Sequence, residues 1–293
     1  MAKLPRNTAS EIVNALSQFI DVFSAPRPVI KVMDDIIRYK SWDTGAESAL
    51  EVAERLSNRC KDRVRRRLEE SQEDGHFLVY VFNSSSDDYI QGSCYIEPQD
   101  DSILVESKIR RANTYKILEE FKSLTPNGFE SLCKNALALL SVKNPILTQA
   151  SADQGVDFFG QASFGELIQS SAMGPGVEKY LKIWMVGQAK HYQATQVSTK
   201  DIRELIGSVS LAKSKVYAGS SDPLKDLQMR VCDPVFFLFF TTGRISRDAK
   251  DLLKKSGVIA MDGEQLAMFL ADNGVGISGR SFDSTLFHSW VHR

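Results

Sequence analysis

The feature that most limits the fold of this chain is the apolar run at residues 235–240, which reads VFFLFF. It has no polar residue at alternate positions, which predicts a strand covered on both faces. The segments on either side, residues 198–213 and 246–255, repeat apolar residues at helical spacing. A strand of this kind between two helices indicates an α/β layer structure.

The neighbouring segments extend this pattern. A helix is expected from Thr125, a suitable N-cap that is followed by Pro126 in the first turn. The expected order from there is helix, three strands, helix, strand, helix, strand and helix. This order predicts a mixed sheet flanked by helices over residues 123–273, and residues 274–293 are expected to be a C-terminal tail.

Residues 1–122 are expected to form a smaller α+β domain with a recognition or regulatory role. Helical runs up to about residue 70 precede two expected strands, 76–82 and 89–97, and residues 103–105 (ILV) predict another short strand. Helices followed by a hairpin are compatible with a winged helix, which reads DNA, and also with many other small α+β domains.

The third helical run contains a cluster of basic residues that includes Arg63, Arg66 and Arg67. These side chains could lie along a nucleic-acid phosphate backbone. Acidic residues follow directly at 69, 70, 73 and 74, and this mixture is also typical of a solvated helix face. Both interpretations remain open at this point.

Composition excludes some classes of protein. The 293 residues carry a formal net charge of −1, which argues against a strongly basic DNA-coating protein but not against a local basic groove. The four cysteines are far apart, which favours a reducing compartment and hence a cytoplasmic protein without zinc or disulfides. Neither a signal peptide nor an apolar run of about 18 residues is visible, so no membrane is expected among the partners.

Two short stretches are the candidates for chemistry. Asp153 and Asp157 flank Gly155 before an apolar run, and Gln188 and Lys190 occupy alternate positions of a later strand. Alternation sends both of the latter side chains to one face. A carboxylate there can hold a divalent cation, and a lysine can act on a phosphate or on the attacking water. A turn aspartate and a solvated strand end are the plainer interpretation.

The motifs in this half of the chain occur in a recognisable order. They are Phe129-Glu130, DQGVD at 153–157, VGQAK at 186–190, IRELIG at 202–207, FTTG at 240–243, and MDG at 261–263. Over about 125–272 the chain thus resembles the Mrr-type restriction endonuclease catalytic domain, a branch of the PD-(D/E)XK nuclease fold. Two departures are Gln154, where the family commonly has glycine, and a long insert at 161–180.

The resemblance implies roles for individual residues. Asp157, Glu130 and Gln188 would hold Mg²⁺ or Mn²⁺, and Lys190 would be the catalytic lysine. Asp153 would shape the turn, and His191 would contact a phosphate or simply end the strand. Residues 241–244 (TTGR) would form either a phosphate cradle or a turn that leads to the helix capped by Ser246.

The function that the resemblance implies is a metal-dependent DNA endonuclease of a restriction or antiviral defence system. Its partners would be DNA, a second or further copy of the chain, and a partner protein of the defence system. The alternative is a nuclease-fold module that has lost catalysis and binds nucleic acid or a protein. The motifs of nucleotide-binding P-loop and dinucleotide folds are absent from the sequence.

Overall fold

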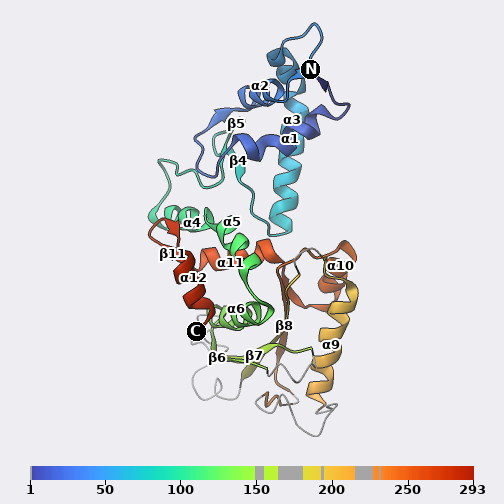
Figure 1. Ribbon diagram of the computed structural model, residues 1–293, viewed down its shortest axis with the longest axis vertical. Coiled ribbons are helices and arrows are strands. Elements are labelled where there is room, and N and C mark those ends of the chain that lie inside the picture. Colours follow the sequence, from blue (N-terminus) through green and yellow to red (C-terminus); the bar gives the residue numbers. More distant parts are fainter. Residues whose placement is uncertain (1, 149–154, 164–180, 193–194, 215–226, 231) are drawn as a thin grey trace. The chain divides into compact units, whose positions relative to one another are not determined.

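The structure is a computed structural model that describes residues 2–148, 155–163, 181–192, 195–214, 227–230 and 232–293 (Figure 1). The chain divides into two compact units, Met1–Asn113 and Thr114–Arg293. The boundary therefore falls earlier than the predicted one at 122/123. The reason is that Ile117 and Phe121 are buried in the core of the second unit.

The second unit is built on a five-stranded mixed sheet in the order β10-β9-β8-β7-β6. β6 pairs with β7, and β7 with β8, antiparallel, whereas β8, β9 and β10 are parallel. The predicted order of helices and strands is confirmed, and the elements are α5 (Thr114–Glu120), a 3-10 turn (Phe121–Ser123), α6 (Pro126–Leu139), β6 (Val142–Leu147), β7 (Phe158–Ser163), β8 (Lys182–Lys190), α9 (Thr199–Lys213), β9 (Val235–Thr241), α10 (Arg247–Ser256), β10 (Ile259–Met261) and α11 (Gly263–Asp272).

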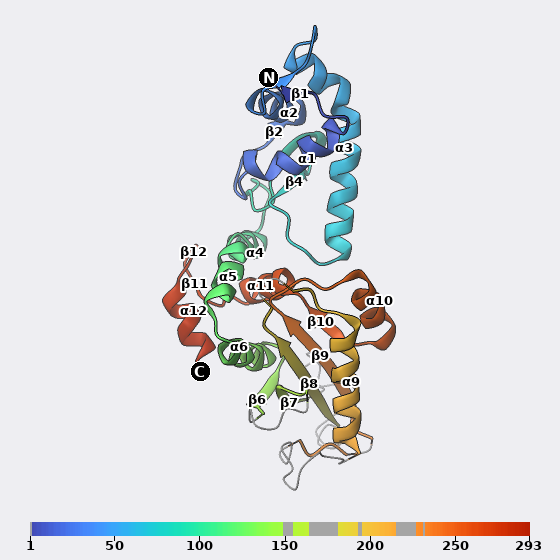
Figure 2. The ribbon, with the colours of Figure 1, turned by 45° about the vertical axis from the view of Figure 1, so that its right-hand side comes forward.

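Helices cover both faces of this sheet (Figure 2). Phe240 of β9 packs in the core beneath α6 and α11, and Phe239 packs in the core beneath α9 and α10. The apolar run at 235–240 is thus buried on both faces, as predicted, from Leu238 onward. Its second residue, Phe236, remains 42% exposed.

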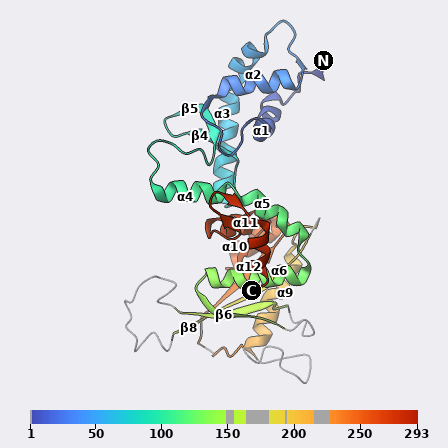
Figure 3. The ribbon, with the colours of Figure 1, turned by 60° about the vertical axis from the view of Figure 1, so that its left-hand side comes forward.

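The last twenty residues are part of the second unit's core rather than a tail. They form the hairpin β11 (Ile277–Ser278) and β12 (Ser281–Phe282) and the helix α12 (Ser284–Val291), which lies beside α6 (Figure 3). Phe287 is fully buried, and Nδ2 of Asn135 donates hydrogen bonds to the carbonyl oxygens of Trp290 and Val291 at 2.7 and 3.0 Å. The expectation of a tail was wrong because the pattern of residues 274–293 is too short to show its buried face.

The first unit is the smaller α+β part. Its elements are β1 (Ala2–Lys3), α1 (Thr8–Phe19), β2 (Arg27–Pro28), α2 (Val29–Tyr39), β3 (Trp42–Asp43), α3 (Ala49–Glu73), β4 (Tyr80–Asn83), β5 (Ser86–Gly92) and α4 (Ser102–Arg111). β2, β5 and β4 form a three-stranded antiparallel sheet, and β1 pairs with β3. The strand expected at 103–105 is wrong, because the Asp101 side chain accepts a hydrogen bond from Leu104 N and caps a helix there.

Among the described residues, no helix is both long enough and apolar enough to cross a bilayer.

Candidate active site

Asp157 lies immediately before β7, opposite the end of β8. Its main-chain N–H donates to Gly187 O at 2.9 Å, and its Oδ2 accepts a hydrogen bond from Ala189 N at 2.7 Å. Val156 packs in the core beneath α9 and Phe158 in the core beneath α6. The residues on either side of Asp157 are thus buried on opposite faces of the sheet, and these two contacts hold the Asp157 main chain in place.

Gly155 allows this turn. It has φ +68°, a left-handed conformation that strains other residues, and a Cβ there would come within 2.6 Å of Ser208 Oγ. The glycine seen in the sequence thus has a structural reason. Asp153 and Gln154 lie outside the described residues, as do residues 164–180 of the expected insert, whereas 161–163 belong to β7.

Gln188 is the buried polar residue of the site. It is 1% exposed, and its Oε1 has no hydrogen-bond partner among the described residues. A buried amide oxygen without a partner loses its hydration without compensation, so such a group calls for an unseen ligand. An amide oxygen is an acceptor, and a hard cation prefers such ligands.

Lys190 faces α9. Its Nζ lies 3.8 Å from Glu204 Oε1, and its side chain is 24% exposed. Burial opposes ionisation of the nearby Asp201, but hydrogen bonds from Ser198 and Tyr192 and the charge of Lys190 leave its pKa lowered. Two carboxylates of α9, Glu204 and Asp201, therefore lie near the ammonium group.

Glu204 was not predicted as a site residue. The sequence shows it only as part of IRELIG, and nothing in that motif says which strand residue it will meet. Its role becomes visible only when α9 packs on β8.

Glu130 is a half-buried residue of α6, and the negative charge of Asp157 acts on its carboxyl group. Burial, and then that negative charge, raise the pKa of Glu130 above its ordinary value. Burial also raises the pKa of the nearby Cys133 thiol, and the carboxylates of Asp157 and Glu130 add to this effect. The fold thus brings two of the predicted metal ligands close together from a helix and a strand end. Mutual repulsion of two such carboxylates is relieved when a cation lies between them.

The described residues contain no cluster of three or more His, Cys, Asp and Glu side chains that could hold a metal ion. The predicted ligands Asp157, Glu130 and Gln188 supply two carboxylates and, as the third group, an amide. Two carboxylate groups and an amide oxygen still match the few hard ligands that Mg²⁺ takes alongside water. The residues present therefore fit a divalent cation.

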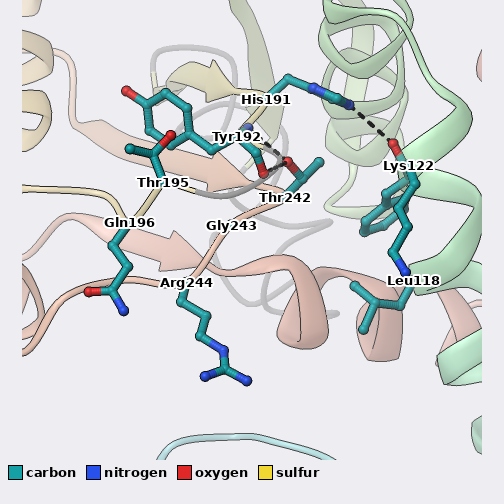
Figure 4. Close-up of a pocket in the computed structure, with 10 residues that line it drawn as sticks. Leu118, Lys122, His191, Tyr192, Thr195, Gln196, Thr242, Gly243 and Arg244 are labelled. Atoms are coloured by element: carbon teal, nitrogen blue, oxygen red, sulfur yellow. Dashed lines mark hydrogen bonds between the residues drawn. The ribbon is translucent and has the colours of Figure 1, made fainter.

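His191 does not point freely toward a substrate. Its Nε2 donates to the carbonyl oxygen of Phe121 at 3.1 Å, and its ring packs edge-on against Phe129 at 5.6 Å between centroids. It also lines a cavity in the second unit, together with Tyr192 and Arg244 (Figure 4). Its expected phosphate contact is therefore untested, and its observed contacts are structural.

The remaining predicted DNA contacts, Arg63, Arg66 and Arg67, lie on α3 of the first unit and not in this site. Arg67 Nη1 donates to Asn14 Oδ1 at 3.1 Å. Arg63 and Arg66 are exposed.

The candidate site thus consists of a strand-end carboxylate, an amide and an ammonium group on alternate positions of the next strand, and a carboxylate on a helix, all on a mixed sheet. Residues 121–219, about a third of the chain, match the family described as restriction endonuclease (Mrr_cat). The matched segment contains Glu130, Asp157, Gln188, Lys190 and Glu204, the five residues of the candidate site.

Solved structures similar to this chain include two restriction endonucleases. MspJI, solved in complex with a 27-mer oligonucleotide, is 19% identical, with a TM-score of 0.41, and the match covers 68% of this chain and 40% of the MspJI chain. The DNA modification-dependent restriction endonuclease AspBHI is 19% identical, with a TM-score of 0.39, and the match covers 72% of this chain and 46% of AspBHI. Protein VC1899 from Vibrio cholerae is 7% identical, with a TM-score of 0.21, and the match covers 90% of this chain and 50% of VC1899. The chain therefore spans half or less of the length of each.

No curated protein matches the chain.

Proposed function

We propose that this chain is a divalent-metal-dependent DNA endonuclease of restriction type. The observation that supports this most is the buried Oε1 of Gln188, which has no hydrogen-bond partner among the described residues. Gln188 lies on β8 two residues before Lys190, and the main chain between them, at Ala189 N, holds the Asp157 carboxylate. These groups lie in the segment that matches the restriction endonuclease family.

Asp157, Gln188 and Glu130 would hold the cation, Mg²⁺ or Mn²⁺. When bound, such an ion neutralises charge on a phosphate oxygen and lowers the pKa of a bound water. The Ala189 N–H keeps the Asp157 carboxylate in place. Lys190, whose Nζ lies 3.8 Å from Glu204, would stabilise the negative charge that develops on the phosphate.

The direct test is a cleavage assay. The full chain, incubated with supercoiled plasmid and Mg²⁺ or Mn²⁺, should produce nicked or linear DNA, and a chelator should stop the reaction. Plasmids with modified and with unmodified bases should be compared, because some restriction-type enzymes cleave modified DNA and others cleave unmodified DNA. Intact plasmid under all these conditions would favour the binding module instead.

The pH dependence follows from the raised pKa of Glu130. A proton on this carboxylate competes with the cation, so the apparent Mn²⁺ affinity should rise as pH increases through that raised pKa. In Glu130→Gln the affinity should be lower by roughly 10-fold and nearly independent of pH in that range. Calorimetric titrations from mildly acidic to neutral pH measure both effects. An equally steep dependence in Glu130→Gln would show that Glu130 is not the titrating ligand.

The first unit is proposed to bind DNA through α3. Its chain order of helices and the sheet order β2-β5-β4 agree with a winged helix, in which the third helix reads DNA. Arg59, Arg63 and Arg66 recur at helical spacing and so share one face of α3. All three are exposed, and no hydrogen bond or ion pair involves them among the described residues.

The other cations of α3 have partners within the first unit. They pair as follows: Arg55 with Glu47, Lys61 with Asp88, Arg65 with Asp62 and Asp87, and Arg67 with Asn14. Two of these acids, Asp87 and Asp88, come from β5. The face of α3 that carries Arg59, Arg63 and Arg66 is therefore the basic surface of the helix. Arg59 therefore replaces Arg67 in the proposed DNA contact.

Replacing Arg59, Arg63 and Arg66 together by glutamine should weaken DNA binding at low salt and reduce its salt dependence. Three lost phosphate contacts correspond to a decrease of roughly 3 in the slope of log K against log salt. The control is the triple glutamine variant of Arg247, Lys254 and Lys255, which removes the same charge from exposed positions of α10. Equal slopes for the two triple variants would contradict a role for α3.

Cleavage of both strands needs two such sites, so we also propose a homodimer or larger assembly on DNA. A cytoplasmic location and a partner protein of a defence system belong to the same proposal.

A further inference from the structure

A cavity of about 760 Å³ opens in the second unit at the carboxyl ends of the parallel strands β8 and β9 (Figure 4). We call it the strand-end cavity. Its walls come from α5 and the turn after it, from the residues that follow Lys190, and from the residues that follow β9. Ligands of α/β sheets bind at the carboxyl ends of strands, and the volume is that of a small-molecule site.

Hydrogen bonds join the two chain segments that line the strand-end cavity after β8 and after β9. Thr242 Oγ1 accepts a hydrogen bond from Tyr192 N at 2.9 Å and donates one to Tyr192 O at 3.0 Å. Val197 N donates to Arg244 O at 2.9 Å. A Cβ at Gly243 would come within 2.8 Å of Thr195 O, so the two segments approach as closely as glycine allows. The cavity is therefore preformed.

The strand-end cavity is lined by cationic and polar side chains on one side and by apolar side chains on the other. Arg244 and Lys122 line it, and no carboxylate is among its ten lining residues. Arg244 is exposed, and its guanidinium has no polar partner in the part of the chain that the structure describes. Lys122 Nζ is bound to Glu119 at 2.7 Å. Leu118 and Phe121 supply the apolar side.

An unpaired guanidinium beside hydroxyl and amide groups, facing an apolar wall, matches a nucleotide. The planar fork of arginine binds phosphate oxygens in pairs. Thr195 and Gln196 offer further hydrogen bonds, and the apolar wall offers a surface to a base or a sugar. The turn 241–244 therefore does more than lead to the α10 helix, whose cap is the Ser246 side chain.

The strand-end cavity adjoins the candidate active site. His191, which lines it, directly follows Lys190, and its ring packs on Phe129, the neighbour of Glu130. We propose that the strand-end cavity binds a nucleotide phosphate through Arg244, either that of a nucleotide in the substrate strand next to the cleaved bond or that of a free nucleotide. The first of these sources rests on the proposed nuclease function.

The test measures binding without cleavage. Thymidine 5′-monophosphate is titrated into the full chain by calorimetry, with thymidine as the probe that lacks the phosphate. A fluorescent DNA duplex is titrated in chelator by anisotropy. Arg244→Gln should weaken phosphate binding by roughly 10-fold, Arg244→Lys should restore part of it, and Arg247→Gln, an exposed arginine three residues on that does not line the cavity, should not change it.

The two titrations identify the source of the phosphate. Loss of affinity for both probes assigns the cavity to the substrate strand, and loss for the mononucleotide alone assigns it to a free nucleotide. Unchanged affinity for both in Arg244→Gln, or equal binding of thymidine and its monophosphate, overturns the proposal. Thermal unfolding of each variant checks that the fold is intact. Plasmid cleavage by the wild type is scored separately, so a failure of the nuclease function is distinguishable from a failure of this site.

Discussion

Replacing Asp157 by asparagine is expected to reduce the rate of DNA cleavage by on the order of 10³-fold or more. Asparagine has the same shape, and its Oδ1 can still accept the hydrogen bond from Ala189 N that now reaches Asp157 at 2.7 Å. The substitution therefore removes the charge that attracts the cation while it keeps the local fold. The measurement is the rate of plasmid nicking at saturating Mg²⁺, with circular dichroism of the variant alongside.

The matched control for this substitution is Asp248→Asn, which removes an exposed carboxylate in the first turn of α10. Its cleavage rate should equal that of the wild type. Equal rates for Asp157→Asn and the wild type would show that this carboxylate does not take part in the reaction.

Replacing Lys190 by methionine is expected to lower kcat by roughly 10²- to 10³-fold, with a much smaller effect on DNA affinity. Methionine keeps most of the side chain's length, so the partly buried stem still packs while the ammonium 3.8 Å from Glu204 is lost. An interaction made mainly in the transition state changes kcat rather than substrate binding. Single-turnover cleavage and anisotropy of DNA binding separate the two quantities.

Lys200→Met provides the comparison, because Lys200 is an exposed lysine of α9 outside the site. It should cleave as fast as the wild type. A Lys190→Met variant that binds DNA more weakly but cleaves bound DNA at the wild-type rate would reassign Lys190 to substrate binding.

The sequence was sufficient for the layers of the second unit. Apolar periodicity at 125–140, the VFFLFF run and the capping residues Thr125 and Ser246 each determine local structure through nearby residues, and both caps are present. The pattern was insufficient where burial depends on distant partners. Phe287 of α12 packs against Phe121, and Asn135 donates a hydrogen bond to Trp290 O, each across more than 150 positions of sequence. No periodicity in residues 274–293 indicates these contacts.

The candidate site divides in the same way. The meeting of Asp157 with the Gln-x-Lys strand was predicted, and the structure joins Asp157 to Ala189. Glu204 was not predicted as a site residue, because its role follows from how α9 packs on β8. Arg244 was considered only as part of a phosphate cradle at 241–244, the alternative to a plain turn, because its place in the cavity follows from how β9 ends beside Tyr192. Among the arginines of α3, only the structure distinguishes Arg67, which has a partner in Asn14, from Arg59, which has no polar partner among the residues that the structure describes.

The most direct test of the central claim is calorimetric titration of Mn²⁺ into the full chain and into two variants without DNA. The claim is that Asp157 and the unpaired Gln188 Oε1 jointly hold a divalent cation. Wild-type protein should bind Mn²⁺ at one site per chain, and Asp157→Asn and Gln188→Met should each bind it at least about 10-fold more weakly. Identical titration curves for the wild type and both variants would contradict the claim.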